Sequence, residues 1–335
     1  MILVTGGTGF IGAHLVRRLA ASGQAVRCLV RRQASPRNLP SGVEAVYGNL
    51  ISGEGLPEAL RGTDTVIHLA GVTKALAPAD YYAGNALATR NLLGALAAAL
   101  AGGLAGRGPR LVHVSSLAAV GPSLDGKPIA EDAEPHPLSH YGKSKLEAER
   151  AVQELAPDAV IVRPPVVYGP GDTDVFPLLK SISKGFVLRL GGGERWFSAI
   201  YVEDLVEGLI TAAGSTGLQQ INGARGRTYF LAHAKPVSWS QFGAAAARIM
   251  NRTPRVLEVP AAIAHVAGWG AEIWSRITRK PGIVSREKVA EAQCKFWTCD
   301  VGRAARELGF QAPTSLENGL AETLACYKEA GWLTY

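Results

Sequence analysis

The sequence lacks the features that mark nucleic-acid-binding and metal-binding proteins. It has no block of Lys and Arg long enough to indicate nucleic-acid binding, although its formal net charge is +7. The four cysteines, Cys28, Cys294, Cys299 and Cys326, are scattered, and Cys294 and Cys299 have neither zinc-ligand spacing nor nearby histidines. We therefore expect no metal site, and four reduced thiols in a cytoplasmic protein.

Long hydrophobic runs are also absent. The most apolar stretch, Ala86 to Gly106, is interrupted by Arg90 and Asn91 and is rich in small residues, which favours a buried helix over a membrane span. The chain starts directly with an apolar strand, so we expect no signal peptide. Without repeats or low-complexity linkers, 335 residues indicate one or two domains with ample core.

The first residues present a strand, a glycine-rich turn and a helix. The apolar run Ile2–Val4 is followed by Thr5–Gly12, and helical periodicity continues to the stop at Ser22-Gly23. Glycines in such a turn let the backbone approach a pyrophosphate, which the helix N-terminus then holds. The alternative is a glycine-rich turn without a ligand. The residues expected to contact a dinucleotide here are Gly6, Gly7, Thr8, Gly9, Phe10, Ile11 and Gly12.

The second predicted strand, Ala25–Val30, indicates which dinucleotide is used. A protein that binds NAD places Asp or Glu at the end of this strand, where it holds the adenosine ribose. Here the strand is followed by Arg31 and Arg32, whose guanidinium groups suit a phosphate. We predict NADP(H) as the cofactor, with a solvated basic loop as the alternative.

Strands and helices then alternate along the chain. Apolar strands are predicted at Val43–Val46, Thr65–Gly71, Leu111–Ser115 and Ala159–Arg163, which favours an α/β, doubly wound parallel Rossmann sheet with helices on both faces. After Gly169 helices dominate, with one return strand at 228–231. We predict a dinucleotide-binding core at 1–168, to which 198–232 returns, and a smaller, mostly helical substrate lobe at 169–335.

Several polar residues follow or interrupt these strands. We expect Asn49, beside Leu50, to face the adenine, and the small residues of Leu69-Ala70-Gly71 to border the cofactor. His68 lies within an apolar strand and is expected to be a packed histidine. Asn85, on a long helix from 80 to 103, is either buried near the site or solvent-facing.

Two segments after Gly169 carry further expectations. Asp204 is expected to cap the helix that follows it and to favour its N-terminal dipole. The apolar stripe of the predicted helix Ala261–Ile277 fits the core of a small lobe, a substrate pocket or a membrane surface.

Tyr141 and Lys145 are the candidate catalytic residues. Their spacing places both on one face of a helix, one turn apart. An ammonium beside a phenol lowers the phenol pKa, and a phenol tuned in this way suits acid–base catalysis near neutral pH. Ser115 and Ser116 end a predicted parallel strand and would face the same crevice.

Together these motifs resemble the extended short-chain dehydrogenase/reductase family, often labelled NAD-dependent epimerase/dehydratase, over nearly the whole chain. The matching segments are 5–12, 68–71, Asn85, Ser115-Ser116, 141–145 and 163–170. Within the family, the Leu29-Val30-Arg31 ending and the region 304–310 look most like the dihydroflavonol reductase and 3β-hydroxysteroid dehydrogenase branch.

The resemblance implies a role for each matching residue. Tyr141 would be the acid/base, and Lys145 would bind the nicotinamide ribose and lower the Tyr141 pKa. Ser116 would stabilise the substrate oxygen, with Ser115 as the second choice. Asn85 is counted with the catalytic set, and Ser115, Tyr141, Lys145, Pro164, Val166 and Val167 with the cofactor contacts. The family often forms homodimers through two helices, here 80–103 and 141–155.

Three functions are compatible with these residues. The first is an NADP(H)-dependent oxidoreductase that acts on a ketone or secondary alcohol of an apolar or cyclic substrate. The second is a nucleotide-sugar epimerase or dehydratase that retains NAD, for which Arg195 is a candidate phosphate ligand. The third is a non-catalytic NADP-binding sensor or scaffold, since fold alone does not establish activity.

Overall fold

The computed structural model describes the chain from Met1 to Tyr335 except residues 33–38, 102–108, 191–192, 215–225, 261, 264–265, 267–269, 271–276 and 279–285. The apolar stripe predicted at 261–277 therefore lies largely outside the described residues. Within the described parts of the chain, no helix is both long and apolar enough to cross a membrane.

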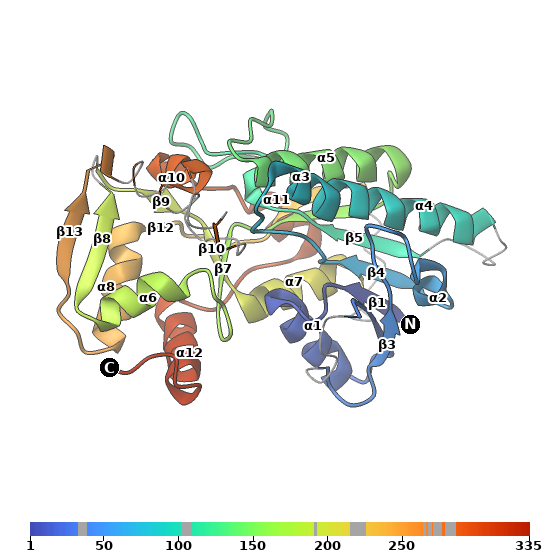
Figure 1. Cartoon of the computed structure of the whole chain (residues 1–335), viewed down its shortest axis with the longest axis horizontal. Coiled ribbons are helices and arrows are strands. Elements are labelled where there is room, and N and C mark those ends of the chain that lie inside the picture. The colour runs from blue at the N-terminus through green and yellow to red at the C-terminus, as the bar shows by residue number, and fades with distance from the viewer. Residues whose placement is uncertain are drawn as a thin grey trace.

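A seven-stranded parallel sheet forms the centre of the molecule (Figure 1). Its order is β11-β6-β5-β4-β1-β2-β3, and each neighbouring pair is parallel. The strands are β1 (Ile2–Thr5), β2 (Val26–Val30), β3 (Glu44–Tyr47), β4 (Thr65–His68), β5 (Arg110–Val114), β6 (Val160–Arg163) and β11 (Thr228–Phe230). The order reverses on either side of β1, as in a doubly wound fold, which confirms the predicted fold class.

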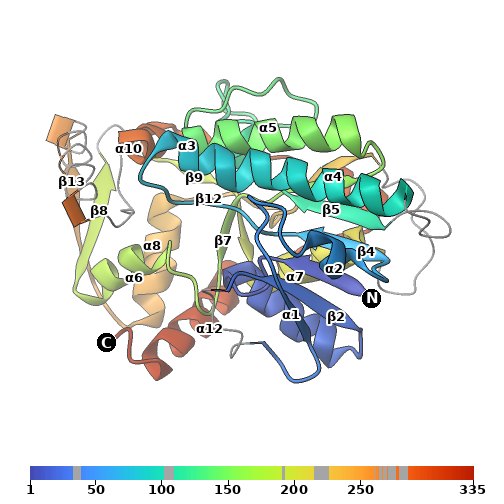
Figure 2. The same cartoon turned by 45° about the vertical axis from the view of Figure 1, so that its right-hand side comes forward.

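Helices cover both faces of this sheet (Figures 1 and 2). α1 (Phe10–Ala21) and α7 (Val202–Ala212) contact each other on one face. α2 (Leu56–Leu60), α4 (Ala88–Ala101) and α5 (His140–Leu155) lie on the other. The central strands read as continuous apolar runs because both of their faces are buried, one under each layer. Each fully buried Leu or Val contributes about 1.5–3 kcal/mol, so these two cores hold the sheet and its helices together.

The predicted helix from 80 to 103 is not uniform. It consists of α3 (Pro78–Tyr81), a π-helical turn η2 (Tyr82–Leu87) and α4, which ends at Ala101. Gly84 lies so close to the preceding loop that a Cβ there would stand 2.3 Å from Val72 Cγ2. The wider turn carries Asn85 into the protein interior, and π-helical turns of this kind often occur at functional sites.

A lobe built on the second half of the chain packs against the carboxyl ends of the strands. Its core joins α6 (Phe176–Ser183), α8 (Trp239–Ile249) and α12 (Leu316–Glu329) through Leu179, Phe242 and Leu320, all buried. α10 (Arg286–Gln293) also belongs to the lobe, whereas α11 (Gly302–Leu308) packs against β11 of the central sheet through Ala304 and Leu308. The proposed division at residue 168 stays a prediction.

The expectation of a single return strand after Gly169 is wrong. Besides β11, β7 (Val166–Tyr168) pairs with β10 (Ala199–Tyr201), and β8 (Phe186–Leu190) pairs with β13 (Arg255–Val259). β9 (Trp196–Phe197) lies between β12 (Val237–Ser238) and β14 (Phe296–Trp297). Strands of two or three residues are too short to show an alternating pattern in the sequence.

Asp204 also departs from its predicted role as a helix cap. Although it lies in the first turn of α7, its carboxylate accepts hydrogen bonds from the backbone N–H and hydroxyl of Thr314, at 3.0 and 2.8 Å. The buried Asp204 therefore fastens the segment before α12 to the Rossmann core, a long-range contact that local sequence does not reveal.

Candidate active site

A cavity of about 800 Å³ lies where the carboxyl ends of β1, β4, β5 and β6 meet the lobe. Gly6, Leu69, Ser115 and Pro164 each follow one of these strands, and each lines the cavity. The crevice at the carboxyl ends of a doubly wound sheet is where ligands bind in this architecture. The other predicted residues that line it are Gly9, Phe10, Ile11, Gly12, Gly71, Asn85, Ser116, Tyr141, Lys145, Val166 and Val167.

The glycine turn between β1 and α1 is shaped for a ligand that approaches its backbone. Gly6 has a φ of +75°, and a Cβ there would lie 2.7 Å from the backbone nitrogen of Ala70. A Cβ on Gly12 would lie 2.1 Å from the Gly6 carbonyl oxygen. Only glycine fits either position, and α1 starts directly after the turn, so its free N–H groups face the cavity.

The opposite wall of the crevice also fits a dinucleotide. The Ser115 hydroxyl is buried and has no hydrogen-bond partner among the residues that the structure describes. A buried polar atom without a partner is uncommon and indicates a missing hydrogen-bonding group. Together with the glycine cradle, this unpaired hydroxyl shows that the residues present fit a pyridine dinucleotide.

Seven predicted cofactor residues do not line the cavity. Gly7 and Ala70 belong to the packing beneath the turn, where a Cβ on Gly7 would lie 2.7 Å from Cys28 Sγ. Thr8, Arg31 and Arg32 are exposed around it. Arg32 forms an ion pair with Glu54 at 3.2 Å.

Asn49 and Leu50 are the remaining two of the seven. The Asn49 side chain accepts a hydrogen bond from the Ile51 N–H at 2.9 Å, while Leu50 packs against the core beneath α2 and α4. The adenine contact of Asn49 stays a prediction.

Tyr141 and Ser116 meet at the floor of the cavity. Ser116 precedes η3 (Leu117–Ala119) and hydrogen-bonds to the Tyr141 phenol, while its oxygen accepts from the Ala118 N–H at 3.1 Å. Burial raises the pKa of Tyr141, and the hydrogen bond from Ser116 and the charge of Lys288 only partly oppose this. The predicted net lowering of the Tyr141 pKa is therefore wrong, because burial outweighs the nearby positive charges.

Lys145 lies one turn further along α5 and is almost fully buried. Its Nζ donates to the Val114 carbonyl oxygen at 2.6 Å. Burial lowers the pKa of Lys145 to about 8, although the charge of Glu149 raises it. Lys145 is thus held at the end of β5, beside the loop at Gly71 where a ribose would lie.

Asn85 is buried and makes contacts on three sides. Its Oδ1 accepts from the Val72 N–H at 2.7 Å, and its Nδ2 donates to the Val72 carbonyl at 3.1 Å and to Ser144 Oγ at 2.8 Å. These bonds tie the loop after β4 to α5 between Tyr141 and Lys145. Of the two alternatives that the sequence leaves open, the buried one is confirmed.

His68 is the packed histidine that the sequence predicts. Its ring nitrogens contact Thr5 Oγ1 at 2.6 Å and Thr89 Oγ1 at 3.0 Å, and burial lowers its pKa to about 3. It is therefore neutral at physiological pH and belongs to the interior of the sheet.

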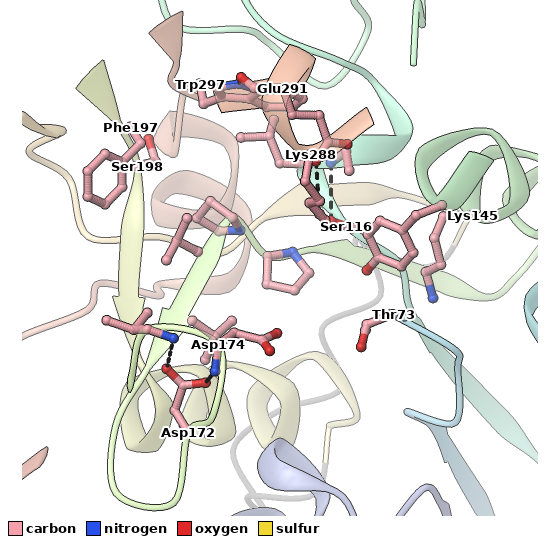
Figure 3. A pocket seen from close by; sticks show the side chains of 18 of the residues that line it. Thr73, Ser116, Lys145, Asp172, Asp174, Phe197, Ser198, Lys288, Glu291 and Trp297 are labelled. Atoms are coloured by element: carbon pink, nitrogen blue, oxygen red, sulfur yellow. Dashed lines mark hydrogen bonds and ion pairs between the residues drawn. The ribbon is translucent and has the colours of Figure 1, made fainter. Parts of the chain in front are cut away.

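The lobe supplies a wall that the sequence does not reveal. Figure 3 shows Lys288, Glu291 and Trp297 above Ser116, and Asp172 and Asp174 across the cavity from Lys145. Burial raises the pKa of Asp172 to about 6, and its carboxylate accepts from the N–H groups of Asp174 and Val175. The segment that holds Lys288 and Glu291 has no motif, so only tertiary contacts identify these residues.

Comparison of the sequence with known proteins identifies a family and several relatives. The profile of the NAD dependent epimerase/dehydratase family matches residues 2–222. A ceramide reductase of Caulobacter vibrioides is 33% identical over 99% of this chain and 96% of its own. A putative dihydroflavonol 4-reductase of Synechocystis is 30% identical over 98% of this chain and 95% of its own.

Solved structures agree in fold. MoeE5 in complex with UDP-glucuronic acid and NAD aligns with a TM-score of 0.74 and 26% identity, covering 98% of this chain and 99% of its own. The similar proteins therefore include both reductases and a protein that binds a nucleotide sugar together with NAD.

Proposed function

Because the chain belongs to the NAD-dependent epimerase/dehydratase family of extended short-chain dehydrogenases/reductases, we propose that it is an NADP(H)-dependent oxidoreductase. It interconverts a ketone and a secondary alcohol on an apolar or cyclic substrate. The observation that carries this proposal is the convergence of Tyr141, Ser116 and Lys145 on one cavity with the glycine turn.

The walls of the cavity favour an apolar substrate. Phe197, Trp239 and Trp297 line it on the lobe side, where the substrate would extend beyond the cofactor. The ceramide reductase relative supports the same substrate class, since a ceramide is a lipid amide. Arg31 and Arg32 support NADP(H), because no carboxylate follows β2 in their place.

When bound, NADP(H) supplies the hydride for ketone reduction or accepts it in the reverse reaction. Tyr141 donates the proton to the carbonyl oxygen during reduction and takes it back during oxidation. Ser116 orients the same oxygen by donating a hydrogen bond. Lys145 holds the ribose hydroxyls, and Asn85 keeps Ser144 and the loop after β4 in place.

The decisive test follows NADPH absorbance with a panel of steroids, flavonoid-like ketones, β-keto acids and an oxidised (keto) ceramide. With the best substrate, Tyr141→Phe is expected to lose about 10²–10⁴-fold in kcat, the range for a positioned acid/base. NADPH binding by fluorescence should persist. Tyr81→Phe is the matched control, because its ring centroid lies 6.3 Å from that of Tyr141. Full turnover by the Tyr141→Phe enzyme would contradict the proposal.

The second candidate is a nucleotide-sugar epimerase or dehydratase. It is favoured by the structural match to MoeE5 with its nucleotide sugar, and by Arg195 on the cavity wall. Such enzymes return the hydride to the same substrate and retain NAD. Nucleotide released from denatured protein separates the two: stoichiometric NAD supports the epimerase, and its absence supports the reductase.

A non-catalytic NADP-binding sensor is the third candidate. Retention of both Tyr141 and Lys145 argues against it, because a sensor needs neither group. NADPH binding without turnover of any carbonyl compound in the panel would favour the sensor.

We also propose that the protein forms a homodimer through α4 and α5. These two helices pack against each other, and they expose Leu100 and Leu155, respectively, at 43% and 52%. Light scattering after size exclusion tests this, and Leu155→Glu should shift a dimer toward monomer. A monomeric wild-type protein at micromolar concentration would refute it.

A further inference from the structure

Helix α10 of the lobe is anchored on the first residue of the catalytic helix α5. The carboxylate of Glu287 accepts a hydrogen bond from the His140 N–H at 3.1 Å, and its other oxygen lies 3.7 Å from His140 Nε2. An acidic side chain at a helix N-terminus is a favourable contact, since the first N–H groups have no partner within the helix. This places α10 directly over the residue that precedes Tyr141.

The next residue of α10 lies over the phenol ring itself. Lys288 Nζ is 5.6 Å from the centroid of the Tyr141 ring, a cation–π distance. Glu291, one turn further on, binds the same ammonium at 2.8 Å, and the Glu291 carbonyl accepts from the Trp297 indole at 2.8 Å. The ammonium is thus held from behind by the Glu291 carboxylate, and the main chain of Glu291 is hydrogen-bonded to β14.

We propose that Lys288 is a positioning residue for proton transfer: a cation supplied by the lobe that orients the Tyr141 phenol and stabilises its ionised form. This inference rests on the proposed acid/base role of Tyr141. Helix α10 would then take part in the chemistry as well as cover the cavity. The reason is that Lys288 reaches Tyr141 through the contact between α10 and α5.

Lys288 is better placed for this role than Lys145. The Lys145 ammonium donates to the Val114 carbonyl, and burial lowers its pKa to about 8. For Lys288, burial acts in the same direction, but the charge and hydrogen bond of Glu291 and the charge of Tyr141 outweigh it, so its pKa is raised. Lys288 therefore stays charged across the range in which a reductase or dehydrogenase works.

Other groups face the phenol from each element packed against it. Glu291 and Asp174 oppose ionisation of Tyr141, and Asp174 is itself paired with Lys74. Among the described residues, the set comprises Ser116 before η3, Tyr81 on α3, Lys145 on α5, Asp174 and Lys74 on facing loops, and Glu287, Lys288 and Glu291 on α10. Lys288 is the member whose charge favours the phenolate from the lobe side.

The test follows the titration of Tyr141 directly and needs no substrate. Protein labelled with ¹³C at the tyrosine ζ carbon is titrated by NMR with NADP⁺ present, and the Tyr141 signal is assigned from its loss in Tyr141→Phe. Lys288→Met should raise the Tyr141 pKa by about one pH unit, the lower end of the range for an opposite charge at this distance, because Lys288 is 44% exposed. Lys288→Arg, which keeps the charge, should restore most of the original value.

Activity provides a second readout with the ketone that the panel identifies. In the reduction assay, the alkaline fall of kcat/KM should move upward with Lys288→Met, because Tyr141 then keeps its proton to higher pH. In the oxidation assay, kcat/KM increases with pH as Tyr141 loses its proton, and the pH of this increase should move upward by the same amount. Lys127→Met removes one exposed lysine elsewhere and should shift neither profile.

The outcomes separate this inference from the proposed function. An unchanged Tyr141 titration in a folded Lys288→Met protein overturns the inference but leaves the reductase proposal intact. A raised KM with an unshifted pH profile also overturns it, since Lys288 would then bind substrate. If Lys288→Met fails to fold, the more conservative Lys288→Gln decides. Full turnover by Tyr141→Phe would instead remove the acid/base role on which the inference rests.

Discussion

The buried ammonium of Lys145 lowers the free energy of unfolding, and this effect can be measured separately from any role of Lys145 in the reaction. Its pKa falls to about 8 in the folded protein, so the folded state binds fewer protons than the unfolded state between about pH 8 and the ordinary lysine range. Stability therefore rises with pH across that window, and below it the ammonium opposes folding. The full shift corresponds to about 3 kcal/mol.

We accordingly expect Lys145→Met to be more stable than the wild type at pH 7 without cofactor. The gain should be about 1–2 kcal/mol, since the bond to the Val114 carbonyl is lost. The advantage should shrink as the pH approaches 10. Urea midpoints of both proteins at the two pH values measure this, and a variant less stable at pH 7 would contradict it.

At the same scale, sequence predicts those residues whose partners are close along the chain. Tyr141 and Lys145 are visible because one helical turn joins them, and the glycines because a turn between strand and helix requires them. Lys288 meets Tyr141 only through the contact between α10 and α5, so no local pattern marks it. For the same reason the sequence does not predict the raised pKa of Tyr141, since the burial that causes it becomes visible only in the fold.

Among the elements, α5 is joined to the sheet by a buried ion pair. Arg163 on β6 donates to both carboxylate oxygens of Glu149 on α5, at 2.9 and 2.6 Å. Both side chains are at most 5% exposed. Arg163→Met should destabilise the protein by about 3–5 kcal/mol, because it leaves the Glu149 charge buried and unpaired.

The double variant Arg163→Met/Glu149→Met is the control, and it should recover a large part of that loss. Urea unfolding of the wild type, both single variants and the double variant gives the coupling energy. A coupling below about 0.5 kcal/mol would mean that the pair does not act as a unit. Because Glu149 also raises the pKa of Lys145, the double variant should lower the Lys145 pKa further.

The same scale shows where element prediction succeeds and fails. β1 and β4 are found because both of their faces are buried, which leaves the apolar runs Ile2–Val4 and Val66-Ile67 at their centres. β9 and β14 are missed because two residues cannot display a period of two. The π-helical turn at η2 is missed because no local pattern marks it, whereas the structure shows Gly84 lying close to Val72 of the preceding loop.

At the scale of the whole molecule, a dinucleotide would join regions far apart in the sequence, so its binding should stabilise the entire chain. Arg31 lies at the end of β2, whereas Tyr141 and Val166 lie at the far side of the crevice. A ligand at 100 times its Kd stabilises the folded state by about 2.7 kcal/mol. Thermal unfolding therefore compares cofactors without knowledge of the substrate.

We expect NADPH to raise the Tm more than NADH at equal concentration, because the 2′-phosphate gains a guanidinium partner. Arg31→Ala/Arg32→Ala should reduce the NADPH shift to that of NADH, which corresponds to about a 10- to 100-fold weaker Kd if the lost phosphate contact amounts to one charge-assisted bond of about 1.5–3 kcal/mol. Arg90→Ala, which removes an exposed arginine on α4, should leave the NADPH shift unchanged. Equal Tm shifts with NADPH and NADH in the wild type would contradict the NADP(H) prediction and would favour the epimerase over the reductase.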